Sequence, residues 1–341
     1  MQTRYDVVAI GNAIMDILAP VEESFIDTHG MERNSMNLID AERALTLHRA
    51  AEDTGELKEI AGGSGVNTLV GIAEMGLRTG LIAKVADDRT GRALRDGFAR
   101  AGVDYNTPPS QTGTPSARSM IFVTPDGSRT MNTFLGASVE FDRTDVREDL
   151  IRASDTLYLE GYLFDGEPAK AAFVHAAEVA RAAGRTVALS LSDPFCVNRH
   201  KASFRQLVEH QSDIVFANEE ELFALTDTTS VDAGLDVAEG KGVAICVTRG
   251  AQGSVISDGE RRYHVKAAPV ERVVDTTGAG DQYAAGVLAG RAMGLSWQDA
   301  GFLGSLAAAE VIQHYGARPE TPIHELALSL ASASPSAGSG S

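Results

Sequence analysis

The sequence predicts an α/β protein of three layers, in which helices cover both faces of a mostly parallel central sheet and a small β-rich lid lies beside it. Short apolar runs of strand length alternate with helical segments of about ten residues, a pattern typical of parallel sheets that are buried on both sides. Two stretches rich in turn residues break this alternation. A chain of 341 residues that is 43% hydrophobic can also bury a substantial core.

The strand–helix alternation runs through most of the chain. Val66, Leu69 and Val70, for example, recur at helical spacing and share one face of an expected helix. The expected strands are 5–10, 79–85, 155–159, 186–191, 214–217 and 243–248. The expected helices are 64–74, 90–101, 169–183, 203–210, 219–225 and 277–293.

The two irregular stretches, 31–40 and 116–135, predict short extended pieces joined by turns, one of them at Pro125-Asp126-Gly127. We therefore expect a discontinuous lid formed by roughly 14–40 and 105–137, within a single domain over 1–330. Residues 331–341 are mostly Ala, Ser and Gly, a composition that predicts a disordered tail.

Composition limits the classes of function. The net charge of −17 argues against a surface that binds nucleic acid, because phosphate neutralisation needs clustered Lys and Arg. Only two cysteines occur, Cys196 and Cys246, each in an apolar run, and we expect buried thiols in a reducing compartment. No apolar stretch approaches about 18 residues, and the first residues lead into a strand rather than a signal peptide. A cytoplasmic protein is the expectation.

The strongest chemical signal is the stretch Asp275-Thr276-Thr277-Gly278-Ala279-Gly280-Asp281. We expect a strand at 270–274, a turn of small residues and then a helix N-terminus, whose N–H groups lack intrahelical partners and favour negative charge. Small residues at 278–280 would let a phosphoryl group approach those N–H groups, and Asp281 could accept a proton from an attacking hydroxyl. A simple helix cap explains the turn equally well.

Two better-known phosphate loops do not fit. A Walker loop needs Gly-Lys followed by Ser or Thr, whereas Gly240-Lys241 is followed by Gly242. A dinucleotide fingerprint needs three spaced glycines after the first strand, and here that strand ends with Gly11 alone. The sequence therefore predicts neither a P-loop enzyme nor a Rossmann-type dehydrogenase.

Polar residues that suit a hydroxylated ligand occur in two further clusters. Asn12 and Asp16 follow the first strand, at the end where ligands bind open α/β sheets. Gly63 and Ser64 precede Asn67 at a helix start, where glycine permits close backbone approach. A carboxylate beside an amide suits a vicinal diol, with Asp16 accepting from both hydroxyls. Turn chemistry and helix caps are the alternative explanation.

Together these clusters resemble the ribokinase-like (PfkB) family of carbohydrate and nucleoside kinases, over residues 4–325. The matching motifs are Gly11-Asn12 with Asp16, Gly62-Gly63-Ser64 with Asn67, Asn218 with Glu221, Thr248-Arg249-Gly250 with Gly253, and the Asp275–Asp281 signature. The resemblance implies a ribokinase-like fold and ATP-dependent transfer of the γ-phosphoryl group to a primary hydroxyl.

The resemblance also assigns roles to individual residues. Asp281 would be the base, while Gly278, Ala279 and Gly280 would hold the transferring phosphoryl oxygens. Asn218 and Glu221 would organise Mg²⁺ through water and Thr248, Gly250 and Gly253 would bind the nucleotide. Arg129 matches a lid arginine that reaches the phosphates, and Asp275 and Thr277 match a site for a monovalent cation such as K⁺.

Among the branches of the family, the chain most resembles the adenosine kinase group, which implies transfer to the ribose 5′-hydroxyl of adenosine to give AMP in purine salvage. Tyr162, Leu163 or Phe164 would then lie against the base and Met36 would close the opposite side, although aromatic residues after a strand are more often core. A sugar kinase acting on ribose or fructose is the alternative, and a non-catalytic sensor a distant one. The sequence leaves open whether the chain is a monomer or a homodimer.

Overall fold

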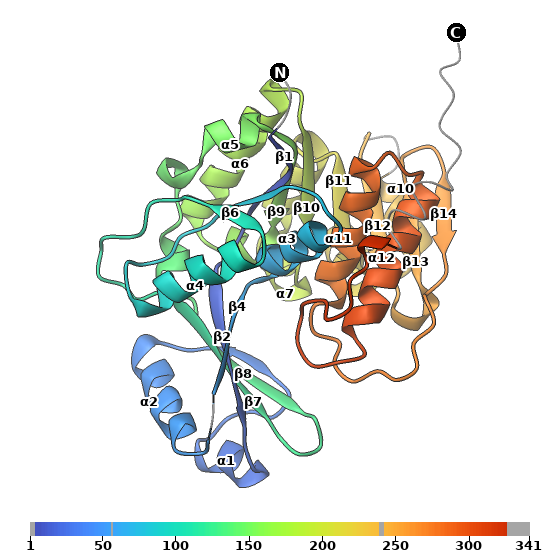
Figure 1. Cartoon of the computed structure of the whole chain (residues 1–341). Helices are drawn as coiled ribbons and strands as arrows, with labels where there is room; N and C mark the ends of the chain where they lie inside the picture. The colour runs from blue at the N-terminus through green and yellow to red at the C-terminus, as the bar shows by residue number, and fades with distance from the viewer. Residues whose placement is uncertain (1–3, 56, 239–241, 326–341) are drawn as a thin grey trace.

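The computed structural model describes residues 4–55, 57–238 and 242–325 (Figure 1). Within them, nine strands form one large sheet in the order β14-β13-β12-β11-β10-β9-β1-β5-β6. Neighbouring strands are parallel except at one edge, where β13 pairs antiparallel with both β12 and β14. The strands of the large sheet are β1 (Tyr5–Ile10), β5 (Thr79–Ile82), β6 (Val103–Tyr105), β9 (Ser154–Glu160), β10 (Thr186–Ser190), β11 (Ile214–Asn218), β12 (Ala244–Thr248), β13 (Ser254–Ser257) and β14 (Arg262–Val265).

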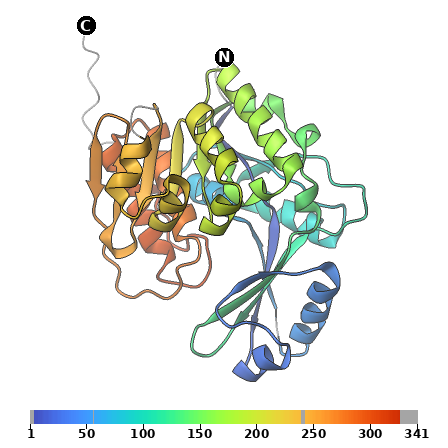
Figure 2. The same ribbon diagram turned by 180° about the vertical axis from the view of Figure 1, so that it is seen from behind.

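Both faces of the large sheet are covered by helices, which confirms the predicted three-layer α/β arrangement (Figures 1 and 2). One face carries α3 (Ser64–Glu74), α4 (Arg89–Arg100), α11 (Ala279–Ala292) and α12 (Trp297–Val311). The other face carries α5 (Glu148–Arg152), α6 (Glu167–Ala182), α7 (Pro194–Arg199), α8 (Lys201–His210), α9 (Glu219–Thr226) and α10 (Val231–Ala238).

Alternation along the strands divides the apolar side chains between these two layers. In β9, Tyr158 belongs to the core on the α3 side, whereas Leu157 and Leu159 belong to the core on the α6 side. Because both faces are buried, the strands appear in the sequence as continuous apolar runs rather than as alternating ones. Both cysteines are buried in these cores, as expected.

A second sheet of five strands lies beside the first, in the order β3-β8-β7-β2-β4. We call it the small sheet; its strands are β2 (Ile14–Pro20), β3 (Met36–Leu38), β4 (Lys58–Gly62), β7 (Ala117–Val123) and β8 (Arg129–Phe134). The hairpin between β7 and β8 closes through the Gly127 N–H, which donates to the Thr124 carbonyl at 2.8 Å. Helices α1 (Glu23–Thr28) and α2 (Ala41–Glu52) complete this part of the molecule, and α2 and β4 lie outside the segments expected for the lid.

The strand expected at 270–274 is wrong. These residues form an extended connection in which Val273 is 54% exposed. The Val274 and Asp275 N–H groups donate to the carbonyl of Ile312, just after α12, instead of to a neighbouring strand. The segment 270–274 is therefore a connection between β14, the edge strand of the large sheet, and α11.

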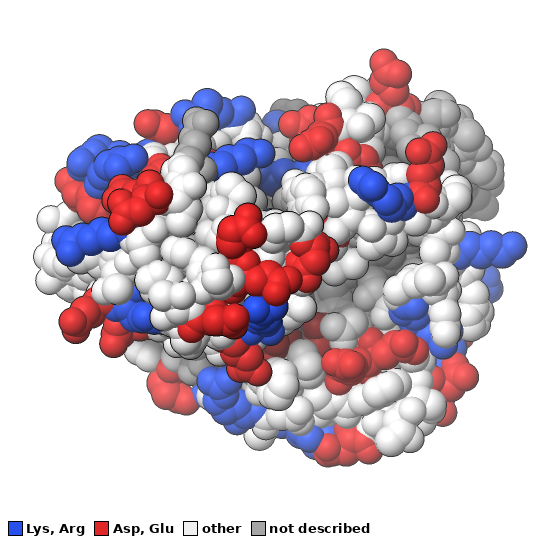
Figure 3. Space-filling model, turned by 90° about the horizontal axis from the view of Figure 1, so that it is seen from below, with Lys and Arg blue, Asp and Glu red and all other residues white. Residues whose placement is uncertain are grey.

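The surface agrees with the composition. Figure 3 shows the molecule from the side of the small sheet, where acidic groups gather in patches among scattered basic groups, as the net charge of −17 leads one to expect. None of the helices in the described part of the chain combines the length and the hydropathy that a membrane span requires.

Candidate active site

The polar residues singled out in the sequence gather where the strand order of the large sheet reverses. From β1 the chain continues to β5 and β6 on one side, and later to β9 and its neighbours on the other. Asn12 follows β1, and Glu160 is the last residue of the adjacent β9. Ligands of open α/β sheets bind at such a reversal, outside the carboxyl ends of the strands. The topology thus points to this end of β1 and β9.

Asp281 lies in the first turn of α11 and faces the first turn of α3. Ser64 Oγ donates to its Oδ1 at 2.5 Å, and Asn67 Nδ2 donates to its Oδ2 at 3.1 Å. Burial raises the pKa of Asp281 to about 6, and these two hydrogen bonds oppose the rise. A carboxylate with this pKa is mostly ionised at pH 7 and can still accept a proton during catalysis.

Glycine is needed at position 63 to bring α3 close to the end of β1. Gly63 has φ of 114°, and a Cβ added there would lie 2.1 Å from the Asn12 carbonyl oxygen. The Gly63 carbonyl accepts from the Asn67 N–H at 2.8 Å, which fixes the first turn of α3. The glycine therefore sets the position of both side chains that hold Asp281.

Glu160 is a buried carboxylate that the sequence analysis did not assign to the site. Its Oε2 accepts from the Asn12 N–H at 3.2 Å and the Gly65 N–H at 2.6 Å, and its Oε1 accepts from Asn12 Nδ2 at 2.7 Å. Burial raises the pKa of Glu160 to about 7. The side chain of Asn12, which was expected to contact the ligand, thus donates to Glu160. Because Glu160 also accepts from Gly65, it links the end of β1 to the start of α3.

Asp16 approaches the same place from the small sheet. It belongs to β2, and its carboxylate lies against Gly62, where an added Cβ would come within 2.3 Å of Oδ2. Burial raises the pKa of Asp16 to about 7; the charges of Arg318 and Arg129 oppose this rise and that of Asp281 adds to it. The site therefore lies between the two sheets, with Asp16 from the small sheet and Asp281 from α11, which covers the large sheet.

The turn before α11 holds the residues that were predicted to form an anion hole. Gly278 is the left-handed N-cap residue, with φ of 80°, and a Cβ there would lie 2.6 Å from Ala317. Ala279 and Gly280 begin the helix, where backbone N–H groups lack intrahelical acceptors. A Cβ on Gly280 would meet no heavy atom within 4 Å, so packing within the protein does not account for glycine there.

Arg129 links the small sheet to this turn. Its Nη1 donates to the buried Asp275 carboxylate and, at 2.9 Å, to Thr277 Oγ1. Asp275 also accepts from the Thr277 N–H at 3.0 Å and the Gly316 N–H at 2.9 Å, and its pKa is held below the usual value. In this arrangement the cation beside Asp275 and Thr277 is the guanidinium of Arg129.

The residues expected at the nucleotide lie at the ends of β11 and β12. Asn218 and Thr248 are paired in register, and Asn218 forms a capping box with Glu221. Both Glu221 carboxylate oxygens accept from Asn218, and burial raises the pKa of Glu221 to about 7. The described residues contain no group of three or more His, Cys, Asp or Glu that could hold a metal ion, so a dedicated protein cage does not fit.

A loop of tight turns follows β12. Gly250 and Gly253 both have positive φ, 54° and 83°, and the Gly253 N–H donates to the Gly250 carbonyl at 3.0 Å. Arg249 Nε donates to Glu219 Oε1 at 3.0 Å, which ties this loop to the start of α9. The expected nucleotide residues are therefore close to one another, at the carboxyl ends of the neighbouring strands β11 and β12.

The apolar residues expected at the acceptor differ in exposure. Leu163 and Phe164 are buried in the core on the α6 side, whereas Tyr162 is 41% exposed. Although the side chain is 41% exposed, desolvation of its hydroxyl group and the charges of Asp193 and Asp281 raise the pKa of Tyr162. Met36 is 46% exposed on β3. Of the three residues after β9, Tyr162 is thus the one available to a ligand.

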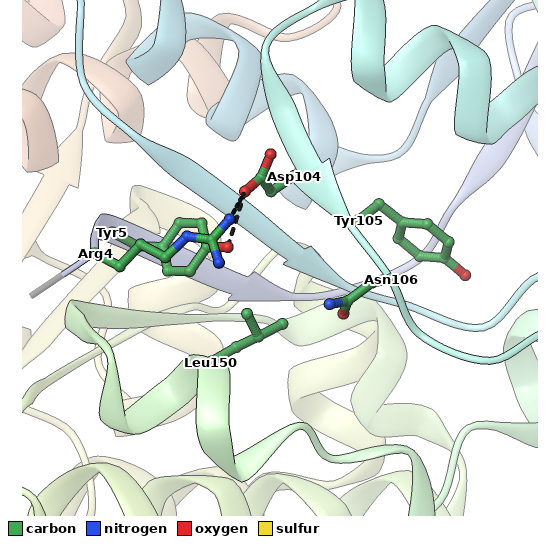
Figure 4. A pocket seen from close by; sticks show the side chains of 6 residues that line it. All are labelled: Arg4, Tyr5, Asp104, Tyr105, Asn106 and Leu150. Atoms are coloured by element: carbon green, nitrogen blue, oxygen red, sulfur yellow. Dashed lines mark hydrogen bonds and ion pairs between the residues drawn. The ribbon is translucent and has the colours of Figure 1, made fainter.

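A pocket of about 170 Å³ lies elsewhere, at the amino end of β1 (Figure 4). Arg4 Nη2 and the Tyr5 hydroxyl both donate to Asp104 Oδ2 on its wall, at 3.1 and 2.8 Å. The pocket is therefore at the opposite end of the large sheet from the site described above.

Comparison with known proteins agrees with this arrangement. The model of the family described as "pfkB family carbohydrate kinase" matches residues 6–324. The chain belongs to the pfkB family. It is similar to the solved structure of adenosine kinase from Sinorhizobium meliloti, at 44% identity and a TM-score of 0.86 over 96% of this chain and 99% of that chain.

Two further relatives of this pfkB kinase have sugar kinase names. A probable sugar kinase from Rhizobium etli CFN 42 is similar at 41% identity and a TM-score of 0.87, over 96% of this chain and 99% of that chain. The 5-dehydro-2-deoxygluconokinase of Geobacillus thermodenitrificans is 27% identical over 90% of this chain and 94% of its own length. The family resemblance drawn from the motifs is confirmed, and the chain is a phosphotransferase that uses an alcohol group as acceptor.

Proposed function

We propose that this pfkB kinase transfers the γ-phosphoryl group of ATP to the 5′-hydroxyl of adenosine, giving AMP and ADP. The observation that carries the transfer reaction is the position of Asp281, a carboxylate with raised pKa at a helix N-terminus, held by Ser64 and Asn67. The acceptor is supported by the 44% identity to a protein titled adenosine kinase and by the exposed Tyr162.

In the proposed reaction, the acceptor oxygen attacks the γ-phosphorus. The bond between the γ-phosphorus and the oxygen that bridges it to the β-phosphate breaks, and ADP leaves. The hydroxyl proton passes to a carboxylate oxygen of Asp281, and the first-turn N–H groups of α11 face the charge on the transferring group. Closure of the small sheet over the site would exclude water, which would otherwise compete as acceptor.

Magnesium would arrive with the nucleotide as part of the substrate. Glu221, whose carboxylate is oriented by Asn218, would contact the waters of that ion. The ion would supply positive charge at the phosphates, in addition to that of Arg129.

The monovalent-cation site proposed at Asp275 and Thr277 overlaps with the position of Arg129. When Arg129 moves to the phosphates, K⁺ would take its place beside Asp275. This exchange predicts a rate that rises with KCl and not with tetramethylammonium chloride at equal ionic strength. Equal rates in the two salts would remove K⁺ from the proposal.

At the acceptor, Asp16 and Asn67 would bind the two vicinal ribose hydroxyls, with Gly63 allowing the close approach of the backbone. Tyr162 would stack on the base, and Met36 on the edge strand β3 would close the opposite side. Because only a small-molecule acceptor and ATP enter this scheme, we expect no nucleic acid or membrane partner. Light scattering would distinguish a monomer from a homodimer, the two states that the sequence leaves open.

The experiment that tests the acceptor is a screen of ADP formation. Adenosine, inosine, ribose, fructose, 2-keto-3-deoxygluconate and 5-dehydro-2-deoxygluconate would each be offered with MgATP. We expect the highest kcat/KM for adenosine. Rapid turnover of a sugar without turnover of adenosine would support the sugar kinase alternative, which the relative from Geobacillus thermodenitrificans favours.

A further inference from the structure

The loop after α12 is fixed to the anion hole by three independent contacts. The Gly316 N–H donates to Asp275 Oδ2 at 2.9 Å. Gln282 Nε2 donates to the Ala317 carbonyl at 3.1 Å, and also to the Asn67 carbonyl at 2.9 Å. Ala317 itself packs against Gly278. The backbone that carries Arg318 is therefore held in place by the catalytic turn.

From this fixed position, Arg318 reaches across to the small sheet. Its Nη2 donates to the carbonyl of Ala61 in β4, and Ala61 is paired with Met15 in β2. The next residue of β4, Gly62, is the one against which the Asp16 carboxylate lies. The guanidinium thus binds the residue of β4 that precedes Gly62, the residue that contacts Asp16.

The Arg318 guanidinium also has a donor that the described part of the chain leaves without a hydrogen bond. Its Nε is buried, and among the described residues no hydrogen-bond partner is found for it. A buried donor without a partner costs free energy, so its retention calls for a reason other than local stability.

We propose that Arg318 is a positioning residue for the acceptor: it ties the catalytic turn to β4 and sets a fixed positive charge beside Asp16, so that this carboxylate can accept hydrogen bonds from the acceptor's hydroxyls. The inference rests on the proposed function in one respect, namely that Asp16 binds the acceptor. It does not depend on whether the acceptor is a nucleoside or a sugar.

The charges around Asp16 determine the pH at which this effect appears. Arg318 from the loop after α12 and Arg129 from β8 favour the carboxylate, whereas Asp281 from α11 disfavours it. With its pKa at about 7, Asp16 titrates near neutrality. Loss of one cation raises the pKa further, so less carboxylate is present at pH 6.5, while at pH 9 nearly all of it remains.

The test compares Arg318→Met and Arg318→Lys with the wild type, using whichever acceptor the wild type phosphorylates in the screen. For Arg318→Met we expect the KM for the acceptor to rise roughly fivefold or more at pH 6.5 and to return within about twofold at pH 9. The kcat at saturating acceptor and the KM for ATP should change by less than about twofold. Arg318→Lys, which keeps the charge, should restore most of the KM at pH 6.5.

A double variant separates the effect of charge from that of structure. In an Asp16→Asn background, Arg318→Met should no longer change the pH dependence of the KM, because the titrating group is gone. A KM increase of equal size at every pH, or Arg318→Lys behaving like Arg318→Met, would overturn the proposal. A sugar as the accepted substrate would instead contradict only the proposed acceptor, since the same KM comparison can be made with that sugar.

Discussion

Asp281 depends on two side chains from a distant part of the sequence. Ser64 and Asn67, both in the first turn of α3, donate to its two carboxylate oxygens and fix its orientation. Each of these hydrogen bonds favours the carboxylate, while burial favours the neutral acid. The balance leaves a group that is charged at neutral pH and still basic enough to take a proton.

Replacement of this carboxylate should separate binding from chemistry. In Asp281→Asn the amide keeps the shape and can still interact with Asn67, but it cannot accept the proton. We expect kcat to fall by about 10² or more, with the KM for ATP nearly unchanged. Asp53→Asn, at an exposed helix end, is the matched control and should retain full activity. A near-normal kcat for Asp281→Asn would show that another group is the base.

The pKa of Asp281 also predicts the acid limb of the rate. Because the base must be deprotonated and its pKa is about 6, kcat should fall tenfold for each unit of pH below about 6 and level off above pH 7. Stopped assays at saturating substrates across pH 5 to 8 would measure this. A flat profile through pH 6 would contradict the assignment.

At the residue scale, local motifs were enough to locate part of the site. Glycine clusters before helices pointed to Ser64 and Asp281, because a helix start and its small residues are contiguous in the sequence. Glu160 and Arg318 carried no such signal, since the groups they hold are up to 148 and 257 residues away. Only the folded chain shows that these residues share the site, Glu160 through the pairing of β9 with β1 and Arg318 through the contacts of the loop after α12.

At the scale of elements, the start of α11 contains two glycines, and a different physical cause favours glycine at each position. Gly278 is required by its positive φ and by contact with Ala317, whereas Gly280 faces open space. The protein's own packing explains the first, and the proposed approach of a phosphoryl group to the backbone would explain the second.

This difference predicts opposite effects for two alanine variants. Gly280→Ala should leave the midpoint of thermal unfolding unchanged or slightly higher, because alanine is favoured in a helix by roughly 0.5–1 kcal/mol, yet lower kcat by about tenfold or more. Gly278→Ala should lower the midpoint, because it adds both strain and a clash. If Gly280→Ala kept full activity, the anion hole would have to lie elsewhere.

Most elements of the large sheet could be predicted, since a strand buried on both faces and an amphipathic helix have distinct apolar patterns. The strand expected at 270–274 could not be distinguished from a connection, because its three valines favour a strand although no neighbouring strand in the described part of the chain pairs with it. The predicted lid did not include α2 and β4. Strand β4 belongs to the small sheet because it pairs with β2, which is distant in the sequence, and its own residue pattern does not indicate this pairing. The sequence does not display partners of that kind.

At the scale of the whole molecule, the site is completed only when the two sheets are joined. Arg129 from β8 binds Asp275 before α11, and Arg318 from the loop after α12 binds Ala61 in β4. The two arginines cross the gap in opposite directions. Their charges offset part of the repulsion between Asp16 and Asp281, which face each other across it.

Removal of Arg129 should therefore lower the free energy of unfolding as well as kcat. The Arg129–Asp275 pair is largely buried, with side-chain exposures of 10% and 5%. Arg129→Ala leaves a buried carboxylate without its cation, and we expect the free energy of unfolding to fall by about 3 kcal/mol. Arg33→Ala breaks the exposed pairs with Glu23 and Asp27, so it should cost less than about 1 kcal/mol. Urea denaturation of both variants would measure the contrast, and equal losses would argue against the pair as a link between the sheets.

The order of the elements along the chain has a consequence for synthesis on the ribosome. In the described part of the chain, every strand of both sheets ends by Val265, whereas Asp281 and Arg318 come later. A growing polypeptide can thus pair all of these strands while it still lacks Asp281, the proposed base, and Arg318. Phosphoryl transfer is therefore among the last properties that the chain acquires as it is made.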